Sequence, residues 1–333
     1  MKSKVTAFGI LALMLLFMTS CINLRNSPMQ GGKQIHVGQG TEDIVLDSWS
    51  ESPRLLISCA DRRHGDEPTF GAIVSYDPKT ELIDTLTINE YPVGLAFRPH
   101  GLDIIEINDH VHLYVVCHDP KEGNHWIANF RVEGKELYWI RNYYAGMLPS
   151  PNAVCAMPDG SLYVNNDHFE HDNNSEVLWK KQVAEIVRFE QDGSHKVAYK
   201  GMAYGNGITF RDSVIYAAST RRNAIYSFDI APNGDLLNRT KIAKLKGPDN
   251  LRWDGDDLIV ACHVKPLKFL KHVKNAEKLS PSVIYRIKLG EKKPILMYAD
   301  KGKNIPACAT GLIYDGKLYI GQVFEDWILE VTE

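Results

Sequence analysis

The sequence has few cysteines and no surplus of positive charge. Six of its 333 residues are cysteine and none belongs to a C-x-x-C pair, so neither a disulfide framework nor a zinc knuckle is predicted. Five of the six follow the N-terminal leader, mostly inside apolar runs such as "LYVVC" and "LIVAC", which predicts buried free thiols. A formal net charge of −3 gives no basic face, so nucleic acid is not expected as a partner.

Several catalytic signatures are also missing. The chain contains no G-x-S-x-G, so a serine nucleophile on an α/β-hydrolase fold has no support. It contains neither H-E-x-x-H nor G-x-x-x-x-G-K-[ST], so zinc-peptidase and P-loop chemistry are not expected. Long helical patterns between strands are mostly missing, which argues against a parallel α/β sheet.

The one long apolar run stands at the start of the chain. In "MKSKVTAFGILALMLLFMTSC" two lysines precede an apolar stretch that is too short for a membrane span of ~20 residues, which predicts a secretory signal. Its ending, Met18 to Cys21, resembles a bacterial lipobox. This implies a lipid on the Cys21 sulfur and an exported lipoprotein at the membrane of a bacterial cell envelope, on its periplasmic or outer surface. A plain signal peptide with an incidental Cys21 is the alternative. The predicted organisation is signal peptide 1–20, lipidated tether 21–32 and folded domain 33–333.

What the sequence does contain is a weak internal repeat. Six β-rich hexamers start 58, 49, 52, 44 and 60 residues apart. Each is preceded by an apolar segment that begins with small or polar residues, and each is followed by a second short strand pattern. The hexamers are LLISCA at Leu55, LYVVCH at Leu113, LYVNND at Leu162, VIYAAS at Val214, LIVACH at Leu258 and LYIGQV at Leu318.

Repeats of ~40 to 50 residues built from antiparallel strands are the signature of a β-propeller. The six copies therefore predict an all-β, six-bladed β-propeller. Two segments have helical spacing, "SEVLWKKQVAE" from Ser175 and "PLKFLKHVKNAEKL" from Pro266. Because both interrupt loops of the blades, we expect short helical insertions that cover one end of the ring.

The first strand of each propeller blade lines the central channel, so the residues that begin these strands should meet near the axis. Any one of them alone is a normal turn residue. Six in phase, including carboxylates that would repel one another, predict a bound cation, and their oxygens suit Ca²⁺. The positions are Glu42-Asp43, His100-Gly101, Asn152, Asn206-Gly207, Asp249-Asn250 and Thr310-Gly311.

Two histidines belong to the same predicted blade. His100 begins its first strand and His118 ends its second, and antiparallel neighbours can bring such side chains into contact. Two imidazoles beside a cation form an acid–base pair that could add water to a carbonyl.

Seven stretches, in this order, resemble the paraoxonase/arylesterase family, calcium-dependent six-bladed propellers that are related more distantly to gluconolactonase-like proteins. The resemblance spans nearly everything from Thr41 onward. The stretches are TEDIVLD, FRPHGLDI, LYVVCHDP, LYVNNDHF, YGNGITF, PDNLRWDGDDLIVACH and GKLYIGQVF. Mammalian members join an N-terminal cysteine to one in the last strand. This chain lacks that pair, so ring closure is expected to depend on strand pairing and burial.

The resemblance implies two Ca²⁺ ions in the channel. It also implies His100 as general base, His118 as its partner in proton transfer, and Asp249 as an alternative base or nucleophile. His263 and Phe324 would line the pocket. The ligands implied for the catalytic ion are Glu42, Asn166, Asn206, Asp249 and Asn250, and those for a deeper structural ion are Asp43, Asp167 and the main-chain carbonyl of Leu102.

The function that the resemblance implies is hydrolysis of carboxylic esters by the domain at 33–333, as an arylesterase, a lactonase or both, with a small-molecule ester or lactone as substrate. Two alternatives stay open. One is a propeller without catalysis, in which calcium only braces a surface that binds carbohydrate or protein. The other is a gluconolactonase-like sugar lactonase.

Overall fold

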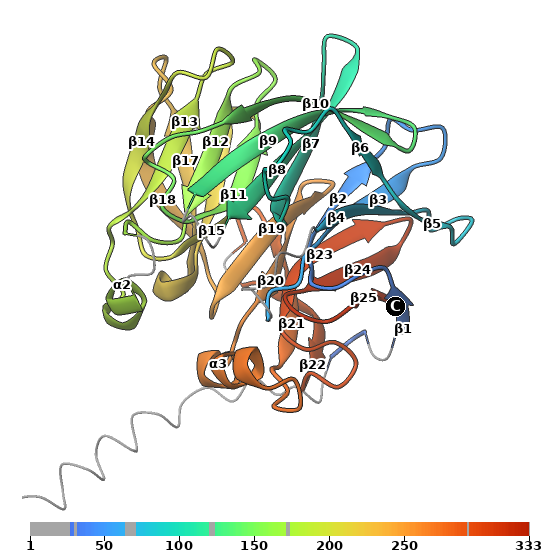
Figure 1. The fold of residues 1–333 in the computed structure, drawn as a ribbon. Coiled ribbons are helices and arrows are strands. Elements are labelled where there is room, and N and C mark those ends of the chain that lie inside the picture. Colours follow the sequence, from blue (N-terminus) through green and yellow to red (C-terminus); the bar gives the residue numbers. More distant parts are fainter. Residues whose placement is uncertain are drawn as a thin grey trace, which may run out of the picture.

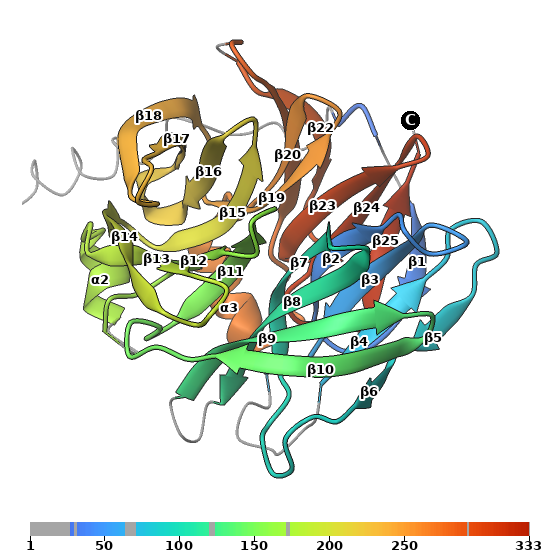
Figure 2. The ribbon, with the colours of Figure 1, turned by 90° about the horizontal axis from the view of Figure 1, so that it is seen from above.

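Six antiparallel sheets surround one axis in the computed structural model, which describes residues 27–29, 32–63, 71–119, 124–170, 174–291 and 293–332. Figure 2 looks along this axis and shows the first strand of every blade innermost. The signal peptide and Cys21 lie outside the described residues. Within those ranges no helix is long and apolar enough to cross a membrane.

The blades follow one another along the chain. Blade one comprises β2 (Thr41–Asp47), β3 (Arg54–Cys59), β4 (Ala72–Tyr76) and β5 (Ile83–Thr85). Blade two comprises β7 (Pro99–Ile107), β8 (His110–Asp119), β9 (Asn124–Glu133) and β10 (Glu136–Tyr143), with β6 (Thr87–Asn89) parallel to β10. Blade three comprises β11 (Pro151–Ala156), β12 (Leu162–Asn166), β13 (Ala184–Phe189) and β14 (His195–Met202). Blade four comprises β15 (Gly205–Arg211), β16 (Val214–Ser219), β17 (Ala224–Ile230) and β18 (Leu236–Lys244), with a 3₁₀ turn at Thr220–Arg222. Blade five comprises β19 (Pro248–Asp254), β20 (Asp257–Cys262), β21 (Ser282–Lys288) and β22 (Ile295–Asp300). Blade six comprises β23 (Cys308–Tyr314), β24 (Lys317–Gln322), β25 (Trp327–Val331) and β1 (Lys33–His36).

The predicted six-bladed propeller is confirmed, and the three strand patterns of every repeat form the three inner strands of its blade. The fourth, outer strands were not predicted. An outer strand packs against a neighbour along one edge only, so its apolar pattern is weak. In β18, for example, most side chains are exposed.

The apolar core lies between neighbouring blades. One cluster joins Leu56 of blade one to the fully buried Trp126 of blade two. Another joins Tyr163 of blade three to Ala217 of blade four. Because each sheet buries both faces against its neighbours, the inner strands are apolar almost throughout, and polar side chains there need a separate explanation.

The ring closes where the first described strand pairs with the last. β1 pairs antiparallel with β25, with Gln34 opposite Leu329 and Ile35 opposite Ile328. The Ile35 side chain is buried in the apolar cluster between blade six and blade one. The five cysteines of the described chain are free and buried, as predicted, so closure depends on strand pairing and apolar burial.

The two predicted helical insertions are present but shorter than expected. α2 (Asn174–Trp179) follows β12, and α3 (Pro266–Lys274) follows β20 with a proline in its first turn, where the missing N–H costs nothing. Each second strand ends beside the beginning of the first strand, as the pairing of Cys262 with Pro248 shows. Both helices therefore lie at the end of the ring where the first strands begin, on the lower side in Figure 1. We call this end the channel mouth.

Replacing Ile35 by alanine should weaken the closure of the ring. Loss of a buried isoleucine side chain should lower the free energy of unfolding by ~2 to 5 kcal/mol, read from the midpoint of urea denaturation. Gln34→Ala, on the exposed face of the same strand, is the matched control and should cost under ~1 kcal/mol. Equal losses in the two variants would contradict closure by apolar packing.

Candidate functional site

The first strand of every blade is irregular at the same place. Near its beginning the pairing with the second strand shifts, so that one more residue lies there than the partner strand requires. Aligning the six strands by this shift gives two successive layers of residues. The mouth layer comprises Glu42, His100, Asn152, Asn206, Asp249 and Ala309, and the second layer comprises Asp43, Gly101, Ala153, Gly207, Asn250 and Thr310.

Buried oxygens without a hydrogen-bond partner gather at the mouth. Among the described residues, Glu42 Oε2, Asn152 Oδ1 and Asn206 Oδ1 are buried and unpaired. Asn166 Oδ1, on β12 opposite Pro151, is unpaired as well. Orphaned buried acceptors are rare in folded proteins and indicate a missing partner such as an ion. All four atoms are acceptors, which is the chemistry that a hard cation such as Ca²⁺ takes.

The site depends on amide oxygens as much as on carboxylates. In the part of the chain that the structure describes, no three histidine, cysteine, aspartate or glutamate side chains gather in an arrangement for a metal ion. Asn166 was implied by the resemblance, whereas Asn152 follows from the register of the repeat. Blade three therefore offers two candidate amide ligands.

Contacts across the ring show that these blades meet at the axis. Asn250 of blade five donates from Nδ2 to Glu42 Oε1 of blade one at 3.1 Å. His100 Nε2 of blade two lies 3.4 Å from the same oxygen. Burial by itself would raise the pKa of Glu42, but the charge and hydrogen bond of His100, together with Arg62 and Asn250, hold it below its usual value. Glu42 is therefore a buried carboxylate that stays ionised.

His100 begins a chain of three imidazoles. Its Nδ1 lies 2.8 Å from His118 Nε2, and His118 Nδ1 lies 2.9 Å from His125 Nδ1. Burial lowers the pKa of His118 well below its usual value, and the charges of His100 and His125 act in the same direction, so His118 is neutral at pH 7. A neutral imidazole has one donor and one acceptor nitrogen, so His118 can accept from one neighbour while it donates to the other. The predicted contact between His100 and His118 is present, and His125 extends it.

Asp249 faces a further histidine. Its Oδ2 lies 2.6 Å from His263 Nε2. Burial raises the pKa of Asp249, and His263 opposes that shift. The His263 ring lies 4.4 Å from that of Phe269 on α3, which in turn lies 5.8 Å from Phe324. The insertion after β20 thus brings an aromatic wall to the channel mouth.

A charged cluster holds this wall in place. Arg63 lies 2.7 Å from Glu325 Oε1 and stacks 4.7 Å above the Phe324 ring. The same guanidinium is 3.1 Å from Nε2 of His272, a fully buried side chain of α3. The Phe324 ring therefore contacts the Arg63 guanidinium, the His272 ring and the Phe269 ring.

The ligands predicted for the deeper ion come together only in part. The Leu102 amide donates to Asp43 Oδ2 at 2.8 Å. Asp167 instead lies beside the mouth: its amide donates to Ser150 O, and its Oδ1 is 2.5 Å from His168 Nδ1. The charge of Asp167 is the main cause that raises the pKa of Tyr204.

Arg252 is a channel residue that the sequence interpretation missed. Its Nη2 lies 2.5 Å from Asp43 Oδ2 and 3.0 Å from Leu102 O. Burial raises the pKa of Asp43 to about 6, and Arg252 opposes the shift. A signal was present, because Arg252 follows Asn250 by two residues and side chains two apart share one face of a strand.

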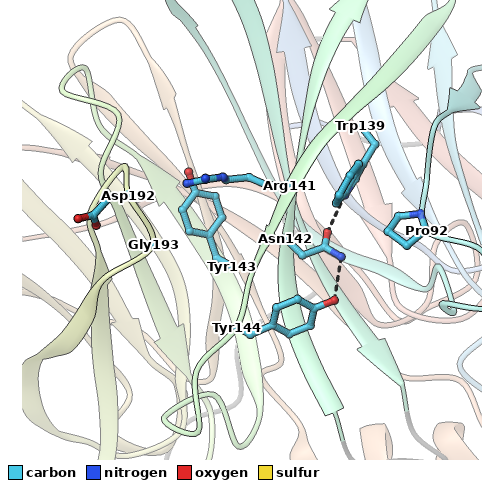
Figure 3. Close-up of a pocket in the computed structure, with 8 residues that line it drawn as sticks. All are labelled: Pro92, Trp139, Arg141, Asn142, Tyr143, Tyr144, Asp192 and Gly193. Carbon is cyan, nitrogen blue, oxygen red and sulfur yellow. Dashed lines mark hydrogen bonds between the residues drawn. The ribbon is translucent and has the colours of Figure 1, made fainter.

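A separate surface pocket of about 430 Å³ lies on the outer strand of blade two. Figure 3 shows two of its hydrogen bonds, from Trp139 Nε1 to Asn142 Oδ1 and from Asn142 Nδ2 to Tyr144 Oη, at 3.0 and 2.9 Å. None of the predicted site residues lines it. The candidate site is therefore the channel mouth.

A family model described as Arylesterase matches residues 71–329. The chain belongs to the arylesterase family. The relationship predicted from the motifs is thus confirmed. The Homo sapiens protein "Serum paraoxonase/lactonase 3" is 28% identical over 240 residues, which cover 68% of this chain and 67% of that protein.

Solved structures of gluconolactonases share the fold of this chain. One described as a putative gluconolactonase has a TM-score of 0.59 at 14% identity and covers 92% of both chains. A gluconolactonase from Xanthomonas campestris has a TM-score of 0.58 at 14% identity and covers 90% of this chain and 88% of its own. At these identities the likeness concerns the fold alone.

Replacing Gly101 by alanine should disturb the mouth. A Cβ there would lie 2.4 Å from Asn152 O and 2.8 Å from the Ala153 Cα, both backbone atoms that cannot turn away. We expect a loss of ~1 to 3 kcal/mol in the free energy of unfolding, measured by urea denaturation.

Gly146→Ala is the matched control, because a Cβ at Gly146 meets nothing within 4 Å in the described structure. This variant should be neutral or slightly more stable. If both variants behaved alike, blades two and three would not approach as closely as the structure indicates.

Proposed function

We propose that this protein is a calcium-dependent hydrolase of carboxylic esters, acting as an arylesterase, a lactonase or both. The observation that carries the proposal is the group of unpartnered buried oxygens at the mouth, which includes Glu42 Oε2, with His100 Nε2 3.4 Å from the other oxygen of the same carboxylate. Family membership and the names of relatives such as serum paraoxonase/lactonase 3 support the same class of reaction.

The ion would be held at the mouth by carboxylate and amide oxygens. Oxygen donors without a thiolate favour Ca²⁺ over zinc or copper. When bound, Ca²⁺ would polarise the substrate carbonyl and offset the negative charge that develops on its oxygen. The residues that would hold it are Glu42, Asn206, Asp249 and Asn250, with Asn152 and Asn166 from blade three.

The histidine chain supplies the proton transfers. His100 is the proposed general base: as a water oxygen forms a bond to the carbonyl carbon, one of its protons moves to the imidazole. The neutral His118 accepts a hydrogen bond from the charged His100 and so stabilises it. When the bond to the leaving oxygen breaks, the proton moves from His100 to that oxygen, and an acid and an alcohol or phenol result.

The wall of the mouth fits an apolar substrate portion. His263 contacts Asp249, the Phe269 ring packs against His263, and the Phe324 ring packs against Phe269. These two phenylalanine rings therefore lie near Asp249. Such rings would hold the aryl or alkyl part of an ester by apolar contact while the carbonyl faces the axis. The lipid on Cys21 and the location in a bacterial envelope remain part of the proposal and depend on the leader alone.

The purified protein should hydrolyse phenyl acetate or a member of a lactone panel that includes gluconolactone. EDTA should reduce the rate by roughly 10²-fold or more, and added Ca²⁺ should restore it, because the charge that stabilises the oxyanion is removed and returned. Calcium binding without turnover on any ester or lactone would instead favour a binding module. Turnover of sugar lactones alone would favour a gluconolactonase-like enzyme.

Two substitutions should separate proton transfer from ion binding. His100→Gln should lower kcat by ~10² to 10⁴-fold and leave the Kd for Ca²⁺ unchanged, as measured by isothermal titration calorimetry. Asp249→Ala should raise that Kd by at least ~10-fold. Loss of a group that only hydrogen-bonds a metal ligand already weakens metal binding by ~10-fold or more, and loss of a ligand itself should weaken it at least as much.

His110→Gln is the matched control, an exposed histidine on the same blade, and should change neither quantity. If His100→Gln kept full activity on every substrate, His100 would not be the base.

A further inference from the structure

Arg252 crosses the channel below the mouth. It belongs to β19 of blade five, yet its Nε donates to Ile44 O of blade one at 2.7 Å. Its Nη2 donates to Asp43 Oδ2 at 2.5 Å and to Leu102 O of blade two at 3.0 Å. The side chain is only 13% exposed. One guanidinium thus joins three blades in the interior of the ring.

Negative charge surrounds this guanidinium. The second layer contains one carboxylate, Asp43, and Asp103 lies two residues beyond Gly101 on β7. Asp103 accepts the amides of Ile104 and Ala156 at 3.0 and 2.7 Å. Arg252 is therefore the cation that pairs with the buried carboxylate of Asp43.

We infer that Arg252 takes the place of the deeper ion, so that the channel of this protein binds no metal below the mouth. The two oxygens assigned to that ion by the family resemblance, from Asp43 and Leu102, already accept hydrogen bonds from Arg252. A Ca²⁺ at ~2.3 to 2.6 Å from the same oxygens would occupy the space of Nη2 and meet a like charge. The residues of the deeper site do not fit a second ion.

The other positions of the second layer agree with this inference. Gly101, Ala153 and Gly207 have no side-chain oxygen. Besides Asp43, the layer therefore offers only Thr310 Oγ1 and Asn250 Oδ1, and the Asn250 amide group is turned to Glu42 by its Nδ2 hydrogen bond. The third predicted ligand, Asp167, lies at the mouth with His168. Because Arg252 already holds the oxygens of Asp43 and Leu102, a Ca²⁺ here would have to draw most of its 6 to 8 oxygens from water. A planar guanidinium needs fewer partners, because its five N–H groups can donate to a carboxylate and to two carbonyls at once.

The inference depends on the proposed function in one respect, the single Ca²⁺ expected at the mouth. Its first test uses the unaltered protein. The purified protein is dialysed to equilibrium against CaCl₂, and the bound calcium is counted by inductively coupled plasma mass spectrometry. One ion per chain is expected, and two ions per chain would overturn the inference. A count of zero would refute the calcium-dependent mechanism and would still leave the deeper position without a metal.

A second test asks what Asp43 pairs with. Asp43→Asn should lower the melting temperature by roughly 5 to 10 °C, equally in CaCl₂ and in EDTA, because its partner is a side chain. The matched control is Glu42→Gln, whose loss should be present in CaCl₂ and shrink in EDTA, because its partner would be the ion. If the loss from Asp43→Asn disappeared in EDTA, an ion would be its partner and the inference would fail.

A double-mutant cycle completes the test. Combining Asp43→Asn with Arg252→Gln should cost less than the sum of the two single variants, since each single variant leaves one buried charge without its partner. The sum of the melting-temperature shifts should exceed the shift of the double variant by several degrees. Additive shifts would show that the two groups do not interact and would overturn the inference.

Discussion

The channel depends on one extra residue at the beginning of each inner strand. A regular strand would turn successive side chains to opposite faces, whereas the bulge brings two consecutive residues to the inner end of each blade. The backbones of neighbouring blades then come so close that some positions admit no side chain. A Cβ at Gly207 would lie 2.7 Å from Asp249 O, as one at Gly101 would collide with blade three. Polar groups and glycines at the hub are thus two results of one backbone irregularity.

The two layers face the same electrostatic problem. The mouth layer contains Glu42 and Asp249 and the second layer contains Asp43, and burial acts to raise the pKa of all three carboxyl groups. In the second layer the guanidinium of Arg252 pairs with Asp43 and also donates hydrogen bonds to main-chain carbonyls of two blades. At the mouth, His100 and His263 contact the carboxylates of Glu42 and Asp249 but leave amide oxygens unpaired. A layer with a fixed internal cation is suited to stability, and a layer with unfilled acceptors is suited to binding.

Most of the fold could be read from the sequence, because the inner strands of a propeller are apolar and repeat in phase. In five blades the residues at the hub followed from the same alignment, and His100 and His118 do touch as that alignment requires. In blade six the alignment was wrong by one residue: it predicted Thr310 and Gly311, whereas the register places Ala309 and Thr310 there. The outer strands were not predicted, because a strand that is exposed along one edge has only a weak apolar pattern. Arg252 escaped because a single basic residue inside "PDNLRWD" resembles an ordinary surface side chain of a strand. Its role depends on partners more than a hundred residues away, which no local pattern records.

The strand that closes the ring has a consequence for how this protein is made. β1 is among the first parts of the domain to be synthesised, yet its partner β25 is the last strand. Until β25 has been synthesised, blade six is incomplete, and β1 has an open hydrogen-bonding edge that could pair with other chains. Five blades can form while the chain emerges, but the ring can be sealed only when β25 has been synthesised and can pair with β1. The final folding step is therefore a contact between the two ends of the domain, with the long sequence separation that makes folding slow.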